Sequence, residues 1–221
     1  MRRLSARFFT ASLIAGMIAV AIAVPASAAS PNAGRGFLAP QARVHGMTLA
    51  EIAGAWDLWA FGSPAESNPL LANRCEASPS DPRIWFLPVS LGGDYEIECD
   101  VPVGAFLVLT PGGYECSTAE GNGETAEELE ACVNANFANL TFVEVALDGR
   151  PASNLERYIV TSPLVQLPGP NLLGEGPTPS MLKSYFMIIA PLSPGEHTVR
   201  AFDEFVNPDF AAGITMNLTV D

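Results

Sequence analysis

Residues 84–110 have the sequence IWFLPVSLGGDYEIECDVPVGAFLVLT, and this stretch decides the fold class. Its middle segment, residues 94–101, alternates strictly between acidic and other residues. Because successive side chains of a strand point to opposite faces, the alternation predicts a strand with one core face and one solvent face. The predicted core face comprises Tyr95, Ile97, Cys99 and Val101, and the solvent face comprises Asp94, Glu96, Glu98 and Asp100.

The rest of the chain extends this β pattern and adds two helices. Capping boxes at Thr48/Glu51 and Thr125/Glu128 predict helices over 49–61 and from 126 to about 136. Loops are predicted over 62–83 and 163–180, and the other strands over 84–87, 105–109, 141–147, 155–160, 184–190, 197–202 and 214–220. The pattern predicts a mainly β domain, an antiparallel β-sandwich of the Ig-like or jelly-roll kind, with an N-terminal helix and one inserted helix.

The N-terminus has the three parts of an export signal. Three arginines precede an uncharged apolar run over 8–24, and the small residues that follow predict cleavage after Ala28. An uncleaved anchor is the alternative, because the apolar run is near membrane-spanning length. The Arg2-Arg3 pair hints at twin-arginine export rather than Sec, although the residues after it fit that signal poorly. We expect a signal peptide (1–28), a flexible leader (29–46) and a single domain (47–221), secreted or in the periplasm or cell envelope, with no stable membrane insertion after cleavage.

The charge of the chain limits its partners. Removal of 1–28 takes away three arginines and no acid, which moves the formal net charge from −13 to −16. A surface this negative repels nucleic acid and anionic lipid, and it favours solubility and cation binding. The partner that we expect is therefore a protein or a glycan, not a nucleic acid.

Four cysteines in an exported chain predict two disulfides. Three pairings are possible, and Cys75–Cys99 with Cys116–Cys132 is preferred because each bridge closes a short loop. The second bridge would tie the inserted helix to the polar, glycine-bearing stretch that precedes it. A zinc site is the competing interpretation, but the cysteine spacings include no C-x-x-C.

The acidic row of the 94–101 strand is a candidate cation site. Between Arg83 and Arg150 the chain has twelve acidic residues and no basic one. Asp94, Glu96, Glu98 and Asp100 would repel one another, which favours a divalent cation such as Ca²⁺ beside them. The alternative is a solvated face that prevents strand-to-strand association. No EF-hand loop is present, and no other cofactor is indicated.

Enzymatic chemistry has one candidate set of residues. Glu115 and Glu120, with Glu98 or Asp100 across the sheet, are acids that could cleave a glycosidic bond. Trp56 and Trp59 on the first helix are either a sugar-stacking platform or the side of the helix that packs on the sheet. A serine hydrolase is disfavoured, because there is no G-x-S-x-G and the two histidines are His45 and His197.

Several short segments resemble those of a group of uncharacterised exported bacterial proteins. They are Ile84-Trp85-Phe86-Leu87, residues 99–105 (CDVPVGA), Glu115-Cys116-Ser117 and residues 191–199 (PLSPGEHTV). The resemblance covers about 48–220 and implies an exported β-sandwich, but it transfers no catalytic residue. We expect a non-enzymatic binding or structural module at the cell envelope or outside the cell. A carbohydrate-active hydrolase that uses a carboxylate pair is the alternative.

Overall fold

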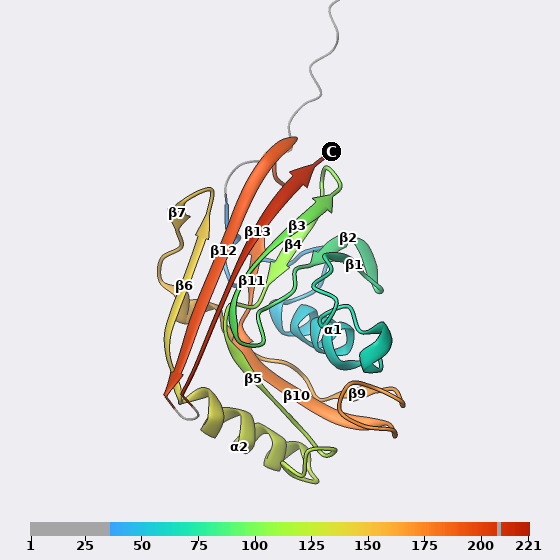
Figure 1. The fold of residues 1–221 in the computed structure, drawn as a ribbon. Helices are drawn as coiled ribbons and strands as arrows, with labels where there is room; N and C mark the ends of the chain where they lie inside the picture. Colours follow the sequence, from blue (N-terminus) through green and yellow to red (C-terminus); the bar gives the residue numbers. More distant parts are fainter. Residues whose placement is uncertain (1–35, 207–208) are drawn as a thin grey trace, which may run out of the picture.

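The computed structural model describes residues 36–206 and 209–221, and Figure 1 shows their arrangement. The predicted export signal lies outside the described residues. The chain is 45% strand and 17% helical, which confirms the prediction of a mainly β, sandwich-like fold with two helices. In the described part of the chain, no helix is long and apolar enough to cross a membrane.

The helices lie close to where the sequence predicts them. Helix α1 spans Leu49–Phe61 and α2 spans Ala126–Phe137, and each begins with the predicted capping box. Two short 3-10 helices are η1 (Ala65–Ser67) and η2 (Leu155–Tyr158). The strands are β1 (Glu76–Ser78), β2 (Asp81–Phe86), β3 (Gly93–Val101), β4 (Phe106–Leu109), β5 (Gly113–Ser117), β6 (Leu140–Leu147), β7 (Arg150–Pro151), β8 (Ile159–Thr161), β9 (Val165–Leu167), β10 (Thr178–Tyr185), β11 (Met187–Ile189), β12 (Gly195–Val206) and β13 (Asp209–Val220).

The strands form three sheets. A five-stranded sheet has the order β3-β13-β12-β6-β7, and a four-stranded sheet has the order β1-β2-β4-β11. The third sheet has the order β5-β10-β8, with β9 also paired to β10. Most pairings are antiparallel, as the sequence predicts, but β3 pairs with β13 and β2 with β4 in parallel. Parallel pairing joins strands that are not linked by a hairpin, so local patterns do not reveal it.

The main core lies between the five-stranded sheet and strands β4 and β11. It includes Leu107 and Ile189 on one side and Val199 and Met216 on the other, all at most 1% exposed. Helix α1 packs on the opposite face of the four-stranded sheet, and Figure 1 shows it on the far side from β12 and β13. The two apolar layers therefore bury both faces of the four-stranded sheet.

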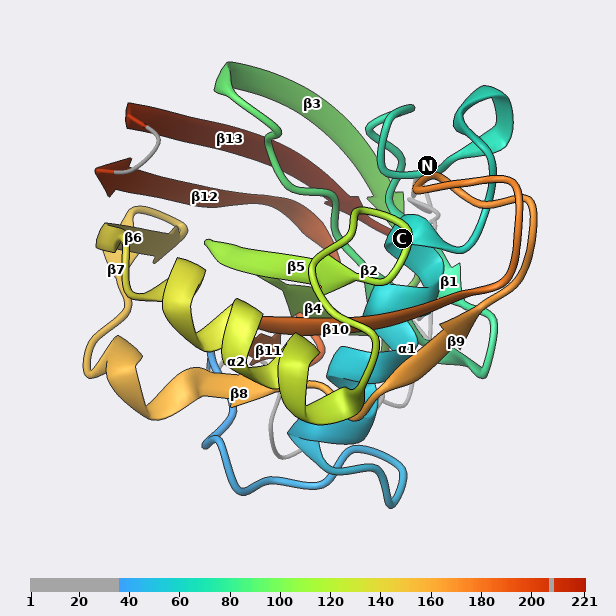
Figure 2. The ribbon, with the colours of Figure 1, turned by 90° about the horizontal axis from the view of Figure 1, so that it is seen from below.

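The third sheet is covered by a helix on each face. Leu182 of β10 belongs to the α1 core, whereas Met181 contacts Leu129 and Val133 of α2. Figure 2 shows β5 and β10 passing between the two helices. This arrangement places alternate side chains of β5 and β10 against α1 and against α2.

Both predicted disulfides are confirmed. Cys75 bonds Cys99 with the Cα atoms 5.8 Å apart, which ties the segment before β1 to β3. Cys116 of β5 bonds Cys132 of α2 with the Cα atoms 6.2 Å apart, so α2 is the disulfide-tied insertion that the sequence predicts. The bridges indicate an oxidising, extracytoplasmic compartment.

Several local predictions differ from the structure. Tyr95 is 48% exposed and not in the core, because it lies on the edge strand β3, whereas its neighbour Ile214 on β13 is 4% exposed. The predicted strand over 155–160 begins as η2 and becomes β8 only at Ile159. The two predicted loops contain β1 and β9, and β2 begins at Asp81. β1 pairs with the adjacent β2 and β9 pairs with β10, and each has only three residues, too few for a clear alternation.

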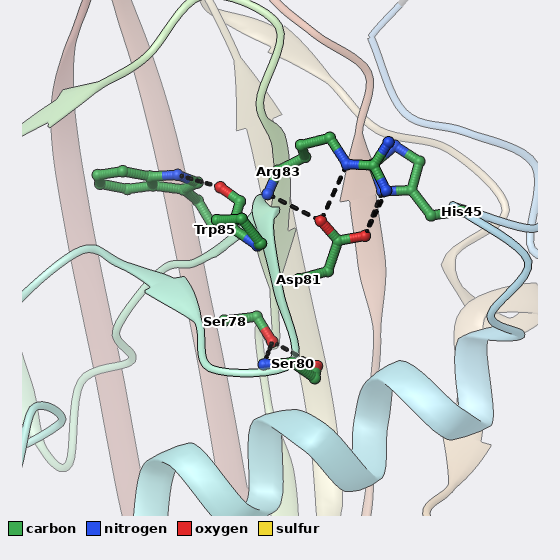
Figure 3. Close-up of polar contacts among 7 residues, drawn as sticks. His45, Ser78, Ser80, Asp81, Arg83 and Trp85 are labelled. Atoms are coloured by element: carbon green, nitrogen blue, oxygen red, sulfur yellow. Dashed lines mark hydrogen bonds and ion pairs between the residues drawn. The ribbon is translucent and has the colours of Figure 1, made fainter.

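Residues 36–46, which the sequence assigns to the leader, contact the domain. Phe37 forms a β-bridge with Ile189, and the amide of Leu38 donates to the carbonyl of Ile188 at 2.7 Å. Val44 is 2% exposed in the α1 core. His45 Nδ1 lies 2.7 Å from Asp81 Oδ2, and Arg83 binds the same carboxylate, as Figure 3 shows. The hydrogen bonds from Arg83 hold the pKa of Asp81 far below its ordinary value.

Candidate functional site

A buried group of carboxyls lies between α1 and the third sheet. Asp57 of α1 is completely buried. The hydroxyl oxygen of Ser180, on β10, lies 3.1 Å and 3.2 Å from the two oxygens of Asp57. The same hydroxyl lies 2.7 Å from Oε1 of Glu115, on β5. One serine therefore links two carboxyls that come from different elements.

The register of the sheet explains why these side chains meet. Ser180 pairs with Ser117 and Leu182 pairs with Glu115, so all four side chains lie on the face toward α1. Asp57 directly follows Trp56 on α1, four residues after the buried Ala53. It therefore occupies the buried stripe of the helix and points at the sheet.

The geometry requires at least one of the two carboxyls to be protonated. A serine hydroxyl has a single hydrogen to donate. If the Ser180 hydroxyl donates its hydrogen to Glu115, its oxygen faces Asp57 with lone pairs only. Asp57 must then be protonated in order to donate a hydrogen bond to that oxygen. The converse holds if the hydroxyl donates to Asp57. Ser180 thus joins a carboxylic acid to a second carboxyl group.

The pKa values of both carboxyls rise in accordance with this geometry. Burial raises the pKa of Asp57 to about 7, against the opposing effect of its hydrogen bond from Ser180. Burial also raises the pKa of Glu115, to about 9, and the negative charges of Asp57 and Glu120 raise it further. Both groups therefore hold protons at a pH where exposed carboxyls have lost them.

Glu115 also forms part of the wall of a cavity of about 200 Å³ between α1, β5, β12 and β13. Aromatic side chains from α1, β5, β12 and β13 line much of it, namely Trp56, Phe61, Tyr114, Phe205 and Phe210. Leu91 is both a wall residue and 55% exposed, so the cavity reaches the surface beside the loop before β3. Of the described wall residues, none is basic.

Two further polar residues belong to this cavity. Asp203 of β12 is a wall residue, and burial raises its pKa to about 7. It packs closely on Gly112, where a Cβ atom would come within 3.1 Å of the Cβ of Asp203. Thr110 is 4% exposed, and its hydroxyl oxygen has no hydrogen-bond partner among the described residues. The cavity thus combines two acids and an unpaired hydroxyl with apolar walls.

The structure brings Glu115 and Glu120 close together, so that Glu120 raises the pKa of Glu115, but Glu98 and Asp100 do not join them. Glu115 lines the cavity, but Glu120 is exposed, and the Ser117 hydroxyl donates to it at 3.4 Å. Glu98 and Asp100 face solvent on β3 and do not line the cavity. Trp56 and Trp59 are 3% and 5% exposed in the α1 core, which agrees with the packing interpretation and not with a sugar-stacking platform.

The candidate cation row is a solvent-exposed face of an edge strand. Asp94, Glu96, Glu98 and Asp100 are all exposed on β3. The side-chain amide of Asn217 on β13 donates to both Glu96 and Glu98, at 3.0 Å and 2.9 Å. Within the described ranges, no three His, Cys, Asp or Glu side chains come together as metal ligands. The row matches the alternative of a solvated edge.

The second histidine has a contact that superficially resembles a Ser-His-Asp triad. His197 Nδ1 lies 2.9 Å from Asp148 Oδ2, and its Nε2 lies 3.3 Å from Ser193 Oγ. However, Nε2 is closer to the Ser193 carbonyl oxygen, at 3.0 Å. A carbonyl only accepts, so this Nε2 carries a hydrogen, whereas a general base needs a free lone pair there. The contact joins the start of β12 to the turn that follows β6.

Sequence reasoning missed Asp57, Thr110, Ser180 and Asp203. A usable signal existed for two of them. Asp203 continues the inward positions of β12 after Val199 and Ala201, and Asp57 lies in the apolar stripe of α1. An acid at a core-facing position is unusual unless it is paired or functional. Thr110 and Ser180 carry no comparable signal.

Comparison with known proteins adds little to this geometry. No protein-family model matches the chain, and no curated protein matches it. One solved structure, "Structure of PbICP-C in complex with falcipain-2", is 12% identical over 62% of this chain and 98% of that chain, with a TM-score of 0.28. A likeness this low carries no argument about fold or function.

Proposed function

We propose that this protein is an exported, non-enzymatic binding module that holds a small ligand in the cavity between α1, β5 and β12. The observation that carries this proposal is the cavity itself, which has Glu115 and Asp203 on its wall. Apolar walls with a few polar groups are typical of small-molecule sites.

The size of the cavity favours a small molecule over the protein or glycan partner that composition alone suggests. An engineered apolar cavity of about 150 Å³ holds benzene. The volume here, about 200 Å³, therefore fits one ring with a short substituent. Export is supported by the arginine-rich, apolar N-terminal sequence and by the two disulfides.

A thermal-shift screen tests the proposal. The protein, purified with intact disulfides, is melted with a library of small molecules that spans cations, neutral compounds and anions. We expect some compounds to raise the melting temperature in the wild type, and fewer or weaker shifts in a cavity-filling Leu182→Trp variant. Uniform absence of shifts across the library would refute the binding function.

A carbohydrate-active hydrolase is the second candidate, because Glu115 and Asp203 line the same cavity. A glycosidase needs one carboxyl as an acid and the other ionised. Burial raises the pKa of both here, so neither is an acid that ionises in its ordinary range. Release of chromophore from model glycosides by the wild type, lost in Glu115→Gln and in Asp203→Asn but kept in Glu204→Gln, would favour the hydrolase.

A further inference from the structure

The cavity contains two carboxyls and no compensating positive charge among its described wall residues. Glu115 comes from β5 and Asp203 from β12, so the acids approach from different sheets. The salt bridges found in the described part of the chain involve neither of them. A buried acid without a cationic partner is costly when ionised. A positively charged ligand would remove that cost at both groups.

The remaining walls suit the same ligand. Trp56, Tyr114, Phe205 and Phe210 present aromatic rings, which attract cations through their π faces as well as packing against apolar groups. An anionic ligand would meet two acids and no basic group among the described wall residues.

We infer that the cavity binds a small organic cation, an ammonium group attached to an apolar or aromatic body, with Glu115 and Asp203 as its counter-charges. The inference rests on the proposed binding function and names the class of its ligand. The ammonium binds beside a wall carboxylate, while the apolar body lies against the aromatic walls. No bond is made or broken in the ligand.

Binding of the cation should release protons from the protein. Burial holds the pKa of Glu115 and of Asp203 above the ordinary range, so at neutral pH Glu115 is largely protonated and Asp203 is about half protonated. Asp57 on α1 and Glu120 after β5 face Glu115 and add negative charge, and Tyr114 is the other titratable wall residue. A bound ammonium lowers the pKa of the two wall carboxyls, and their protons pass to the buffer.

Three probes of similar shape test the inference by isothermal titration calorimetry. They are 2-phenylethylamine, 2-phenylethanol and phenylacetate, which are cationic, neutral and anionic at about pH 8.5, where Asp203 is already ionised and Glu115 is near its pKa. We expect the amine to bind at least about tenfold more tightly than the alcohol, because one charge-assisted hydrogen bond is worth about 1.5–3 kcal/mol. We expect no binding of the acid. The measured enthalpy for the amine should change with the ionisation enthalpy of the buffer, which reports the proton release.

Matched variants identify the groups responsible. Glu115→Gln and Asp203→Asn should each weaken binding of the amine about tenfold and leave binding of the alcohol within about twofold. Glu204→Gln removes the same charge from the exposed face of β12 and should leave both probes unchanged. A variant is folded if its circular dichroism spectrum and its affinity for the alcohol match those of the wild type.

The outcomes separate the two proposals. Equal affinity for amine and alcohol, or tighter binding of the acid, would overturn the cation inference while the binding function stands. An amine affinity that falls equally in Glu204→Gln would reduce it to attraction by the overall negative surface, and would overturn it as well. If none of the three probes binds, the cation inference is overturned, and the library screen alone then decides the binding function.

Discussion

Replacement of Asp57 by Asn should make the protein less sensitive to rising pH. Asp57 is completely buried, and its pKa is raised from an ordinary value of 3.8 to about 7. A carboxyl with a raised pKa in the folded state holds its proton there after the unfolded chain has lost it. Its contribution is therefore most favourable below pH 3.8, declines as pH rises, and is fully lost above about pH 7.

The size of the effect follows from the shift. About three pKa units at 1.36 kcal/mol each correspond to a loss on the order of 4 kcal/mol from this group between pH 4 and pH 7 or above. The amide that replaces the carboxyl would be neutral at every pH, and its oxygen can still accept the Ser180 hydrogen. The Asp57→Asn variant should thus gain stability relative to wild type as pH rises, by up to that amount.

Urea denaturation followed by tryptophan fluorescence at pH 4, 5, 6, 7 and 8 measures this difference. Other carboxyls, such as Asp81 and Asp148, have lowered pKa values and add an opposite trend to both proteins. The difference between variant and wild type cancels that trend. Asp100→Asn, on the exposed face of β3, is the matched control and should give a flat difference. Parallel pH curves for Asp57→Asn and wild type would refute the argument that a buried carboxyl here is kept protonated.

Three other substitutions test separate parts of the structure. Thr110→Val removes a buried hydroxyl that has no partner among the described residues, at nearly constant shape, so the free protein should gain about 1 kcal/mol in urea denaturation, and a loss would show that the hydroxyl is paired. The Glu96→Gln, Glu98→Gln double variant should be more stable than the free wild type by a few tenths of a kcal/mol at low salt, and this gain should shrink above about 0.15 M salt. If the wild type instead shows a Ca²⁺-dependent rise in melting temperature that the variant abolishes, the row is a metal site. Paired replacement of Cys116 and Cys132 by Ser should lower the free energy of unfolding by about 2–4 kcal/mol, and α2 should lose hydrogen-exchange protection first; unchanged stability would contradict the role of this bridge.

Features that depend on neighbours in the sequence were predictable. The side chain of Glu51 accepts from the Thr48 amide at 2.7 Å, and both capping boxes place a helix start at the predicted residue. The alternation of β3 correctly identifies its inner residues from Cys99 onward and its exposed acids. Both signals arise within a few residues of chain, where local geometry alone decides the outcome.

Features that depend on distant partners were not predictable in this way. β9 has only three residues and exists because it pairs with β10, and β3 joins the five-stranded sheet through a parallel pairing with β13. Tyr95 follows the alternation of β3 but lies at the open edge of the sheet, so it is 48% exposed while its β13 neighbour Ile214 is buried. Periodicity gives the direction of a side chain, but its place in the sheet decides whether it is buried.

The charged residues of the candidate site show the same difference between what the local sequence reveals and what the folded neighbours decide. Counting acids draws attention to β3, whose carboxylates lie in water, where solvent and salt weaken their effect within about 10 Å. Glu115 and Asp203 are two of the 24 acids. They differ from the acids of β3 because each points inward from its strand, which a count of acids does not show. In a partly buried cavity a charge interacts several times more strongly than at the surface. Selectivity for a charged ligand therefore depends on these two residues, while the large negative charge elsewhere influences only how such a ligand approaches.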